Sequence, residues 1–336
     1  MYGIKMLKIK ESYLNIFTQT LYWFLFLTTL ALISSRVFPH SDALITLKYI
    51  GFSLPRYWFI FFCLLLTTQW KRLSTFKKYS LPFIIATSFY YLDFQLNIIT
   101  KTLNTKDFPS YTLVSANLGE GVELERLEYI IRLYNPDTFV FQESQNLSGF
   151  KTFKNYPFKD CKGHLCFISK HEFKMVNFLG NSMFDGYGNW AAFYEVNINN
   201  IKVNIANVHL PTVRRAFSNF HNFDAVHSNR VIAAGILNQW ASLKENVIIA
   251  GDFNMTVTDN LYQRNFTNYQ NAITDYGIGF NNTFDYIYRG FSIPGVRVDH
   301  ILFSGDYNIE KASVLVNLGG DHRPVLSKFT IDNGEE

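Results

Sequence analysis

The sequence predicts an α/β protein, a layered sandwich of two sheets with helices outside, preceded by apolar helices near the N-terminus. Three observations predict it. The first hundred residues contain three long apolar segments. From about residue 110 onward, short apolar runs alternate with polar turns and with two segments of helical periodicity. Polar residues also recur where the predicted strands end, and elements of this kind assemble into layered α/β folds.

The two parts of the chain differ in charge. The 336 residues include 31 basic and 27 acidic ones, of which ten basic and three acidic residues lie in residues 1–100. The first part therefore carries a net charge of +7, and the remainder, with 21 basic and 24 acidic residues, carries −3. The overall charge of +4 belongs to the N-terminal part and does not indicate nucleic-acid binding.

Residues 1–100 are predicted to be a membrane anchor with about three transmembrane helices, at 13–35, 50–70 and 80–99. The first segment has no charged residue and exceeds the ~20 helical residues that cross a bilayer core of ~30 Å. A signal peptide is the alternative for 13–35, although its apolar region usually has only ~7–15 residues. Amphipathic or buried helices are the alternative for the other two, the last of which contains Asp93. Residues 101–109 are a predicted linker.

Basic residues indicate the orientation of this anchor. The leader "MYGIKMLKIK" and the loop "KRLSTFKK" at 71–78 are both basic, and basic loops usually stay in the cytoplasm. Three spans then predict a multi-pass protein of a bacterial inner membrane, with its C-terminal domain in the periplasm. If the third segment only lies on the surface, the domain faces the cytoplasm instead.

Cysteine spacing agrees with an oxidising compartment. Cys161 and Cys166 bracket "KGHL", and such a spacing could close a disulfide across a tight turn. His164 lies between them, so a metal site is the alternative. Three candidate ligands in one short loop, without a second cluster, do not favour it.

The domain predicted at 110–331 is built in chain order from strands and two helices. Its first helix at 124–134 has apolar residues at helical spacing and is stopped by "NPD" at 135–137. The second helix, at 225–243, has an apolar stripe through Val226 and Trp240. The predicted strands are 111–118, 138–143, a hairpin of 190–198 and 201–210, the stretch "VIIAGDFNM" at 247–255, 296–304, 310–316 and 322–331.

Polar side chains stand at the ends of these strands. Asp252 and Asn254 are two apart, so in a strand they point to the same side. Singly, each residue has a structural explanation, such as a turn cap or a helix start. Asp299 is harder to explain in this way, because a carboxylate among apolar residues is costly without a partner. Six such positions indicate a functional site: Asn117, Glu143, His209, Asp252 with Asn254, Asp299 with His300, and Asp321 with His322.

This ordered set resembles the endonuclease/exonuclease/phosphatase superfamily, the group of DNase I, the apurinic endonucleases, neutral sphingomyelinases and inositol-polyphosphate 5-phosphatases. The motifs that carry the resemblance, over roughly 110–331, are Asn117, "QE" at 142–143, "NVHLP", "GDFN", "VDHIL" and "GDH". The resemblance implies a four-layered α/β sandwich of the DNase I-like kind with its site across the top of both sheets. Two positions depart from the family pattern, Ala116 in place of an aromatic residue and Gly320 in place of a serine.

The resemblance also implies an activity, the metal-dependent hydrolysis of a phosphodiester or phosphomonoester by direct attack of water. Carboxylate oxygens suit Mg²⁺, with Mn²⁺ as the alternative cation, and the implied metal-binding residues are Glu143, Asn117 and Asp321. Asp252 then orients or activates the water, and Asn254 binds phosphoryl oxygens. His322, paired with Asp299, contacts the scissile phosphate. His209 protonates the leaving oxygen or contacts phosphate.

The substrate class is open between a lipid headgroup, a nucleic acid and a small phosphodiester. Arg214 and Arg215 follow the His209 strand and are candidates for binding further phosphates, whereas Arg230 is predicted to hold the fold. A nuclease usually has a basic face for the phosphate backbone, whereas this domain has a net charge of −3, which weakens the nuclease interpretation. The membrane segments, which look like those of a bacterial membrane-anchored subgroup, favour lipid or periplasmic substrates. A catalytically silent binding module is the third alternative, and no obligate protein partner is predicted.

Overall fold

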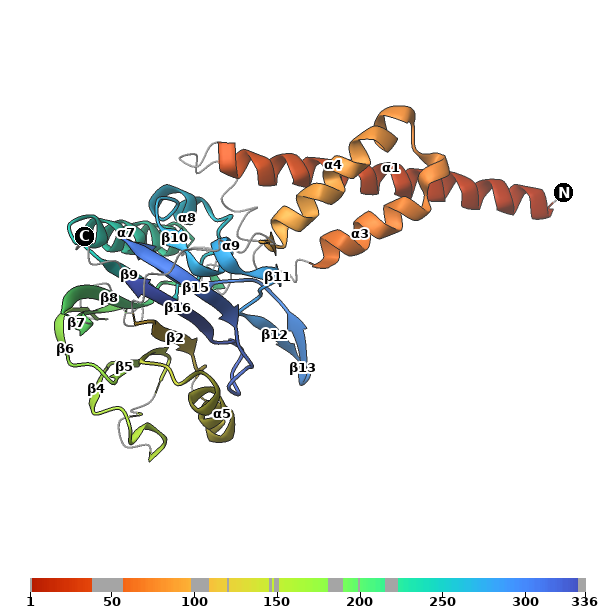
Figure 1. The fold of residues 1–336 in the computed structure, drawn as a ribbon. Coiled ribbons are helices and arrows are strands. Elements are labelled where there is room, and N and C mark those ends of the chain that lie inside the picture. Colours follow the sequence, from red (N-terminus) through yellow and green to blue (C-terminus); the bar gives the residue numbers. More distant parts are fainter. Residues whose placement is uncertain are drawn as a thin grey trace. The chain divides into compact units, whose positions relative to one another are not determined.

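The computed structural model describes residues 2–37, 57–97, 109–119, 121–144, 147, 151–180, 190–198, 200–214 and 223–331. The chain separates into two compact units, Met1–Phe94 and Gln95–Glu336. Figure 1 shows the first as a group of helices and the second as a layered α/β domain. Each unit has its own hydrophobic core.

The N-terminal unit consists of α1 (Tyr2–Val37), α3 (Tyr57–Thr68), the short 3-10 helix η1 (Trp70–Arg72) and α4 (Thr75–Tyr91). Its core includes Tyr22 from α1, Phe59 from α3 and Ile84 from α4. Within α1, residues 10–33 are long and apolar enough to cross a membrane. This is the helix predicted at 13–35.

The two later apolar helices differ from their predicted bounds. α4 begins after the extended residue Ser74 and ends at Tyr91, so the prediction of one helix over 80–99 is wrong at both ends. The physical reason lies at Asp93, which adopts a left-handed conformation (φ 57°) and leads into the strand β1 (Phe94–Leu96). α3 has 12 residues, fewer than the ~20 that cross a bilayer core. The first part of the predicted 50–70 segment lies outside the described residues.

The C-terminal unit contains two six-stranded sheets. In spatial order, the first is β10 (Gln270–Asn271), β14 (Asp299–Ser304), β9 (Val247–Asp252), β8 (Ile201–His209), β7 (Ala191–Ile198) and β6 (Phe173–Leu179). The second is β15 (Tyr307–Val314), β16 (Val325–Ile331), β2 (Tyr111–Asn117), β3 (Thr138–Gln142), β5 (Leu165–Ser169) and β4 (Phe158–Lys162).

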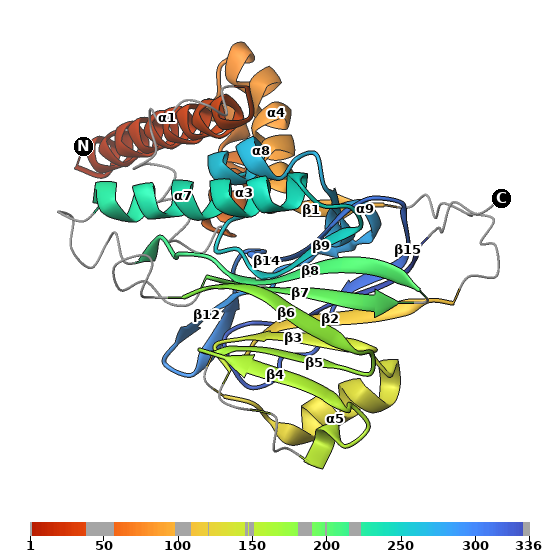
Figure 2. The same cartoon turned by 90° about the vertical axis from the view of Figure 1, so that its left-hand side faces the viewer.

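Helices cover the outer faces of both sheets. α5 (Leu124–Tyr134) lies outside the second sheet and α7 (Phe223–Ser242) outside the first, as Figure 2 shows. This is the predicted four-layered α/β sandwich. Shorter elements complete the unit: η2 (Lys151–Phe153), α8 (Asn260–Asn265), α9 (Ala272–Tyr276), β11 (Ile278–Phe280), and the hairpin of β12 (Asp285–Tyr288) and β13 (Phe291–Pro294).

Alternate side chains of the central strands pack on opposite faces. In β9, Ile248 and Ala250 belong to the core between the sheets, whereas Val247 and Ile249 pack in the core that includes residues of α7. Strands that are buried on both faces read as continuous apolar runs, which is why "VIIA" lacks a polar alternation. Burial on both faces also fixes the register, because a shift by one residue would exchange the two cores.

Two pairs of parallel strands determine where the polar strand ends meet. β2 is parallel to β3, and β8 is parallel to β9, so in each pair the carboxyl ends lie at the same edge. β14 runs antiparallel to β9, and its first residue Asp299 pairs with Asp252. β16 starts opposite Ser115 of β2, which brings the preceding loop with His322 to the same edge. The topology therefore gathers one edge of both sheets into a single polar region.

Most predicted elements are confirmed, and the differences have identifiable causes. The helix at 124–134 is confirmed with the same bounds. The predicted 296–304 strand begins only at Asp299, where its pairing with β9 starts opposite Asp252. The predicted strand 322–331 begins at Val325, after Pro324. Strands β4, β5 and β6 were not predicted.

We expect a fragment of residues 105–336 to fold without the N-terminal unit, since both sheets and their cores lie beyond residue 110. Circular dichroism and a cooperative thermal transition would measure this. A fragment starting at residue 95 should be more stable. It retains Asn97, whose Nδ2 donates to the carbonyl oxygens of Thr274 and Gly277, and each such bond contributes about 1 kcal/mol. A molten 105–336 fragment would contradict the boundary.

Candidate active site

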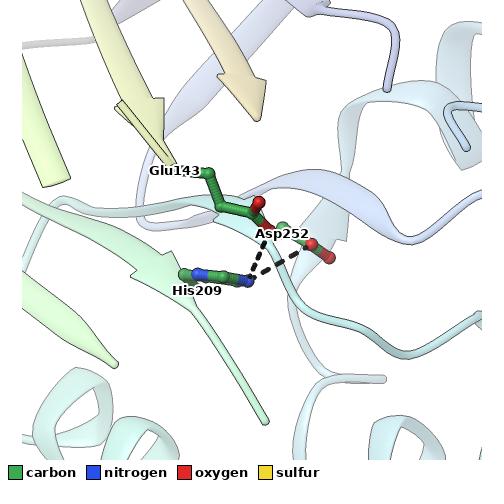
Figure 3. A group of neighbouring side chains, drawn as sticks. All are labelled: Glu143, His209 and Asp252. Carbon is green, nitrogen blue, oxygen red and sulfur yellow. Dashed lines mark ion pairs between the residues drawn. The ribbon is translucent and has the colours of Figure 1, made fainter. Parts of the chain in front are cut away.

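Glu143, His209 and Asp252 converge from the ends of three strands. His209 Nε2 lies 3.3 Å from Glu143 Oε1 and 3.7 Å from Asp252 Oδ2, as Figure 3 shows. One ligand atom from each of the three residues lies within 4.8 Å of the others. Asn117 links the two carboxylates, because its Nδ2 donates to Glu143 Oε1 (3.1 Å) and to Asp252 Oδ2 (3.0 Å).

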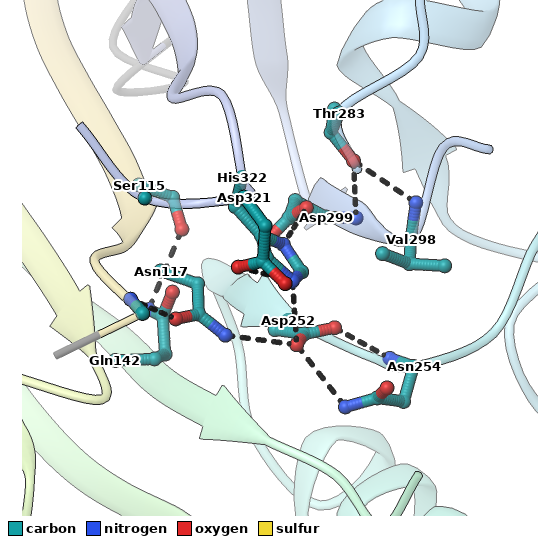
Figure 4. Close-up of polar contacts among 12 residues, drawn as sticks. Ser115, Asn117, Gln142, Asp252, Asn254, Thr283, Val298, Asp299, Asp321 and His322 are labelled. Atoms are coloured by element: carbon teal, nitrogen blue, oxygen red, sulfur yellow. Dashed lines mark hydrogen bonds and ion pairs between the residues drawn. The ribbon is translucent and has the colours of Figure 1, made fainter. Parts of the chain in front are cut away.

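A second group forms around His322 on the other side of Asp252. His322 Nδ1 lies 2.8 Å from Asp299 Oδ2, and His322 Nε2 lies 3.8 Å from Asp252 Oδ2. The backbone of Asp299 is held by Thr283, whose Oγ1 accepts from the N–H groups of Val298 and Asp299 (Figure 4). The ring of Phe284 packs against the His322 imidazole, with centroids 5.3 Å apart. Asp252 is therefore shared by both groups.

Burial and charge together set the protonation of this second group. Burial raises the pKa of Asp299, and the positive charge of His322 partly offsets that rise. Burial by itself would lower the pKa of His322, but the carboxylates of Asp299 and Asp252 outweigh it and the net pKa is raised. Near neutral pH the shared proton therefore lies on His322, and a positively charged imidazolium faces the site.

The stretch "GDFN" turns sharply after β9. Gly251 has φ 148°, and a Cβ atom there would lie 2.0 Å from the carbonyl oxygen of Val208, so only glycine fits. Asn254 adopts φ 49°. Its backbone N–H donates to Asp252 Oδ1 (2.7 Å) and its Nδ2 to Asp252 Oδ2 (3.1 Å). The proximity of Asp252 and Asn254 is confirmed, but the predicted strand geometry is wrong. A turn, not strand alternation, brings them together.

Arg230 stabilises this turn through hydrogen bonds, in agreement with its predicted structural role. Its side chain is fully buried, and its Nη1 donates to the carbonyl oxygens of Pro211 (2.9 Å) and Asn254 (3.0 Å). Its Nη2 pairs with Asp259 at 2.8 Å. One arginine therefore joins α7 to the loops that follow both β8 and β9.

Of the remaining predicted residues, Asp321 and Arg214 lie at the rim. Asp321 is partly exposed, with one carboxylate oxygen 4.0 Å from His322 Nε2 and the other 3.9 Å from Arg214 Nη1. The Arg214 guanidinium lies over the ring of Phe284, 4.3 Å from its centroid. Arg215 lies outside the described residues. His300 turns away from the site: its Nε2 faces the carbonyl oxygen of Met255 (2.8 Å), and burial lowers its pKa to about 3.

Several supporting interactions were not predicted from the sequence. Gln142 and Asn207 form a buried amide pair between the two sheets, in which Gln142 Nε2 donates to Asn207 Oδ1 (2.7 Å). Asn207 interrupts the apolar run that ends at His209, and this signal could have identified it. Thr283 and Phe284 lie in a loop without any periodic pattern, so no sequence signal distinguishes them.

The donor set fits a divalent cation. Glu143 and Asp252 offer carboxylate oxygens beside the imidazole of His209. Asp252, Asp299 and His322 lie equally close together, but there the protonated His322 already supplies the positive charge. Hard oxygen ligands of this kind suit Mg²⁺ or Mn²⁺. Asn117 directs its amide N–H toward the carboxylates, while its Oδ1 accepts from the N–H of Gly119 (3.0 Å). In this arrangement Asn117 orients Glu143, and its predicted role as a metal ligand stays a prediction.

A two-sheet α/β sandwich with carboxylates and histidines gathered at one edge defines the DNase I-like class of hydrolases. The sequence pattern of the endonuclease/exonuclease/phosphatase family matches residues 114–322, and the chain belongs to this family. It is accordingly a metal-dependent hydrolase acting on ester bonds, of the phosphoesterase type.

Solved structures share the fold at low sequence identity. An endonuclease/exonuclease/phosphatase family protein from Bacteroides thetaiotaomicron matches with a TM-score of 0.51 and 17% identity, over 68% of this chain and 100% of that one. TDP2 from C. elegans matches with 0.51 and 17%, over 68% and 78%. The 3' phosphatase NExo from Neisseria, bound to a product DNA hairpin, matches with 0.52 and 16%, over 65% and 98%. A comparison with curated proteins found no match.

We expect Asp252→Asn to lower kcat by ~10²–10⁴-fold, the usual contribution of a general base or orienting group. The amide should also destabilise the fold. Both Asp252 oxygens accept from N–H groups, so the new NH₂ must face at least one donor, at a cost of about 1–3 kcal/mol. Turnover and thermal unfolding would be measured on the same preparation.

Asp306→Asn is the matched control, because Asp306 is an exposed residue before β15, at the sheet end away from the site. It should leave both quantities unchanged. Near-wild-type turnover of folded Asp252→Asn protein would refute the role of Asp252.

Proposed function

We propose that this protein is a membrane-anchored phosphoesterase that uses Mg²⁺, or alternatively Mn²⁺, and hydrolyses its substrate by direct attack of water. The observation that carries the proposal is the position of Asp252. Its buried carboxylate lies between the Glu143–His209 group and the Asp299–His322 pair. A water molecule and a phosphate next to it would meet an acceptor, two histidines and a cation-binding carboxylate at once.

The cation would be held by Glu143, with Asp321 as a candidate at the rim, and when bound it supplies positive charge for the phosphate oxygens. Asp252 accepts a hydrogen bond from the attacking water and orients it, because its carboxylate is fixed by Asn117 and Asn254. Protonated His322, held by Asp299, supplies a second positive charge to the scissile phosphate. His209 protonates the leaving oxygen, and Asn254 and Arg214 bind phosphate oxygens.

We propose that the domain works outside the cytoplasm, in the periplasm, from a multi-pass inner-membrane anchor. The long apolar helix α1 supports membrane attachment. Cys161 and Cys166 form a disulfide, which supports an oxidising compartment. Both features agree with the predicted sidedness of the domain, and the three-span topology is part of the proposal.

A lipid phosphoester is the substrate class we favour. The β12–β13 hairpin exposes Ile287 (58%), Tyr288 (60%) and Phe291 (75%). Its base adjoins the site, because Phe284 packs on His322 and Arg323 pairs with Asp285 at 2.7 Å. An apolar surface beside a phosphate site suits an amphiphilic substrate. The net charge of −3 does not favour a nucleic acid.

We expect hydrolysis by the purified full-length protein to require a divalent cation. The assay compares phospholipid vesicles, DNA, RNA and a simple phosphodiester, each with Mg²⁺, with EDTA, and with Mn²⁺ added after EDTA. EDTA should abolish activity and either cation should restore it, with the vesicles as the preferred substrate. Full activity in EDTA would overturn the metal assignment, and preference for DNA or RNA would identify a nuclease.

Glu143→Gln separates metal binding from water activation in the same assay. It should lose activity at low Mg²⁺ and recover part of it at high Mg²⁺, because its proposed role is to bind the cation. Asp252→Asn should resist such rescue. If neither variant responds to Mg²⁺, the distinction between the two carboxylates fails.

We expect reporter fusions after residue 336 to place the domain in the periplasm. An alkaline phosphatase fusion should be active and a green fluorescent protein fusion should be dark, because the former needs an oxidising compartment and the latter does not mature there after export. The opposite result would mean an even number of spans. It would also contradict the disulfide as a property of the protein in its cell.

A further inference from the structure

The β4–β5 hairpin reaches the site through its turn. β4 and β5 are joined by Gly163 and His164, and the Cys161–Cys166 disulfide crosses the hairpin one pair from this turn. The carbonyl oxygen of His164 accepts two hydrogen bonds from Ser144, one from its backbone N–H (3.1 Å) and one from its Oγ (3.2 Å). Ser144 directly follows Glu143. The disulfide-bonded hairpin is therefore connected to Glu143, the proposed metal-binding residue, through the hydrogen bonds between His164 and Ser144.

Glu143 depends on these bonds because the strand no longer holds it. β3 ends at Gln142, and Glu143 adopts φ 47°, a left-handed conformation that L-residues with side chains rarely adopt. Such a conformation persists only where neighbouring contacts enforce it. Ser144 is buried and is fixed on the far side of Glu143 by the His164 carbonyl. β3 and Ser144 therefore fix the backbone on either side of Glu143, while Asn117 holds its carboxylate.

One residue of the turn that supplies this carbonyl has an unfavourable backbone conformation. Gly163 and His164 have φ values of 53° and 69°, the signs of a two-residue hairpin turn that usually places glycine or asparagine at such positions. His164 has a side chain, so its conformation carries a steric cost. β4 is also an edge strand, paired in its sheet with β5. The backbone pairing of β4 with β5 and the Cys161–Cys166 disulfide hold this turn closed.

The disulfide joins this turn to a firmly held strand. Cys166 lies opposite Phe141 of β3, and its carbonyl oxygen accepts from Asn207 Nδ2 at 3.1 Å. Cys161 lies on the edge strand β4. The covalent bond thus fixes the edge side of the hairpin to the side anchored in the sheet interior. It closes a loop with only four residues between the cysteines, and the gain in global stability from so short a loop lies at the low end.

We propose that the Cys161–Cys166 disulfide is a positioning element of the active site, which holds the His164 carbonyl so that Glu143 binds the divalent cation. The proposal rests on the metal-binding role assigned to Glu143. Closure converts two thiols into one S–S bond, releasing two protons and two electrons to a disulfide-bonded or quinone oxidant outside the cytoplasm. Before export the thiols stay reduced, Glu143 is less constrained and cation affinity is low. The enzyme therefore reaches full competence after export.

The test compares three forms of the full-length protein: wild type, Cys161→Ala/Cys166→Ala, and Cys63→Ala. Cys63 is a free cysteine of the N-terminal unit, so its variant controls for loss of a thiol. Hydrogen exchange of the Ser144 amide reports the bond to His164, and exchange along β16 reports global stability. Mn²⁺ binding, followed by electron paramagnetic resonance, reports cation affinity without any substrate.

We expect the double variant to exchange the Ser144 amide at least about tenfold faster, with β16 unchanged. Mn²⁺ affinity should fall by about 10–100-fold, the range seen when groups that support a metal ligand are removed. Treating wild type with a dithiol reductant should reproduce both effects. The dithiol reduces the Cys161–Cys166 disulfide to two thiols by thiol–disulfide exchange and is itself oxidised to a cyclic disulfide. Cys63→Ala should resemble wild type.

His164→Gly in the Cys161→Ala/Cys166→Ala background distinguishes a disulfide that positions the His164 carbonyl from one that only stabilises the fold. Glycine adopts the left-handed conformation without steric cost and keeps the carbonyl that Ser144 needs, so it should recover part of the Ser144 protection and of the Mn²⁺ affinity. Unchanged Ser144 exchange in the double variant, or equal acceleration along β16, would overturn the proposal. Faster Ser144 exchange with unchanged Mn²⁺ affinity would retain the link from the disulfide to Ser144 but overturn the step from Ser144 to cation binding, whereas the metal role of Glu143 itself is tested by Glu143→Gln.

Discussion

The buried carboxylate of Asp252 is the interaction on which the rest of the site depends. A carboxylate that is removed from water must be compensated by donors or positive charge, or it would take up a proton. Asn117 and Asn254 supply N–H groups to it, and His322 supplies positive charge at 3.8 Å. These residues come from three separate stretches of the chain. The need to compensate one charge therefore fixes the mutual positions of segments that are far apart in sequence.

The two sheets make this arrangement rigid. Parallel pairing of β2 with β3 and of β8 with β9 delivers the strand ends to one edge, and the apolar faces of the same strands lock their register. Below that edge, the Gln142–Asn207 amide pair joins the sheets, and Arg230 joins α7 to the Asn254 turn. These buried side chains are tolerated because each makes at least two hydrogen bonds, although Gln142 Oε1 has no partner among the described residues. The scaffold thus positions the reactive groups before any ligand arrives.

The surroundings of the site connect it to the rest of the chain. On one side the disulfide-closed β4–β5 turn holds Ser144 next to Glu143. On the other, Phe284 contacts both His322 and Arg214 at the base of the β12–β13 hairpin. The apolar helix α1, the Cys161–Cys166 disulfide and the exposed apolar hairpin agree with the proposed function, an enzyme for lipid phosphoesters outside the cytoplasm.

The sequence by itself determined the class of fold, the first membrane-length helix and the identity of the polar strand ends. These follow from local patterns: apolar periodicity, chain-length requirements of a bilayer, and short motifs such as "GDFN" and "GDH". Tertiary structure alone decided that Asn254 reaches Asp252 through a turn, that His300 faces Met255 and leaves the site, and that α4 ends before Asp93. It also decided the roles of Thr283 and Phe284 in supporting the Asp299–His322 pair. The reason is physical: each of these depends on backbone angles and on partners distant in sequence, which no local pattern encodes.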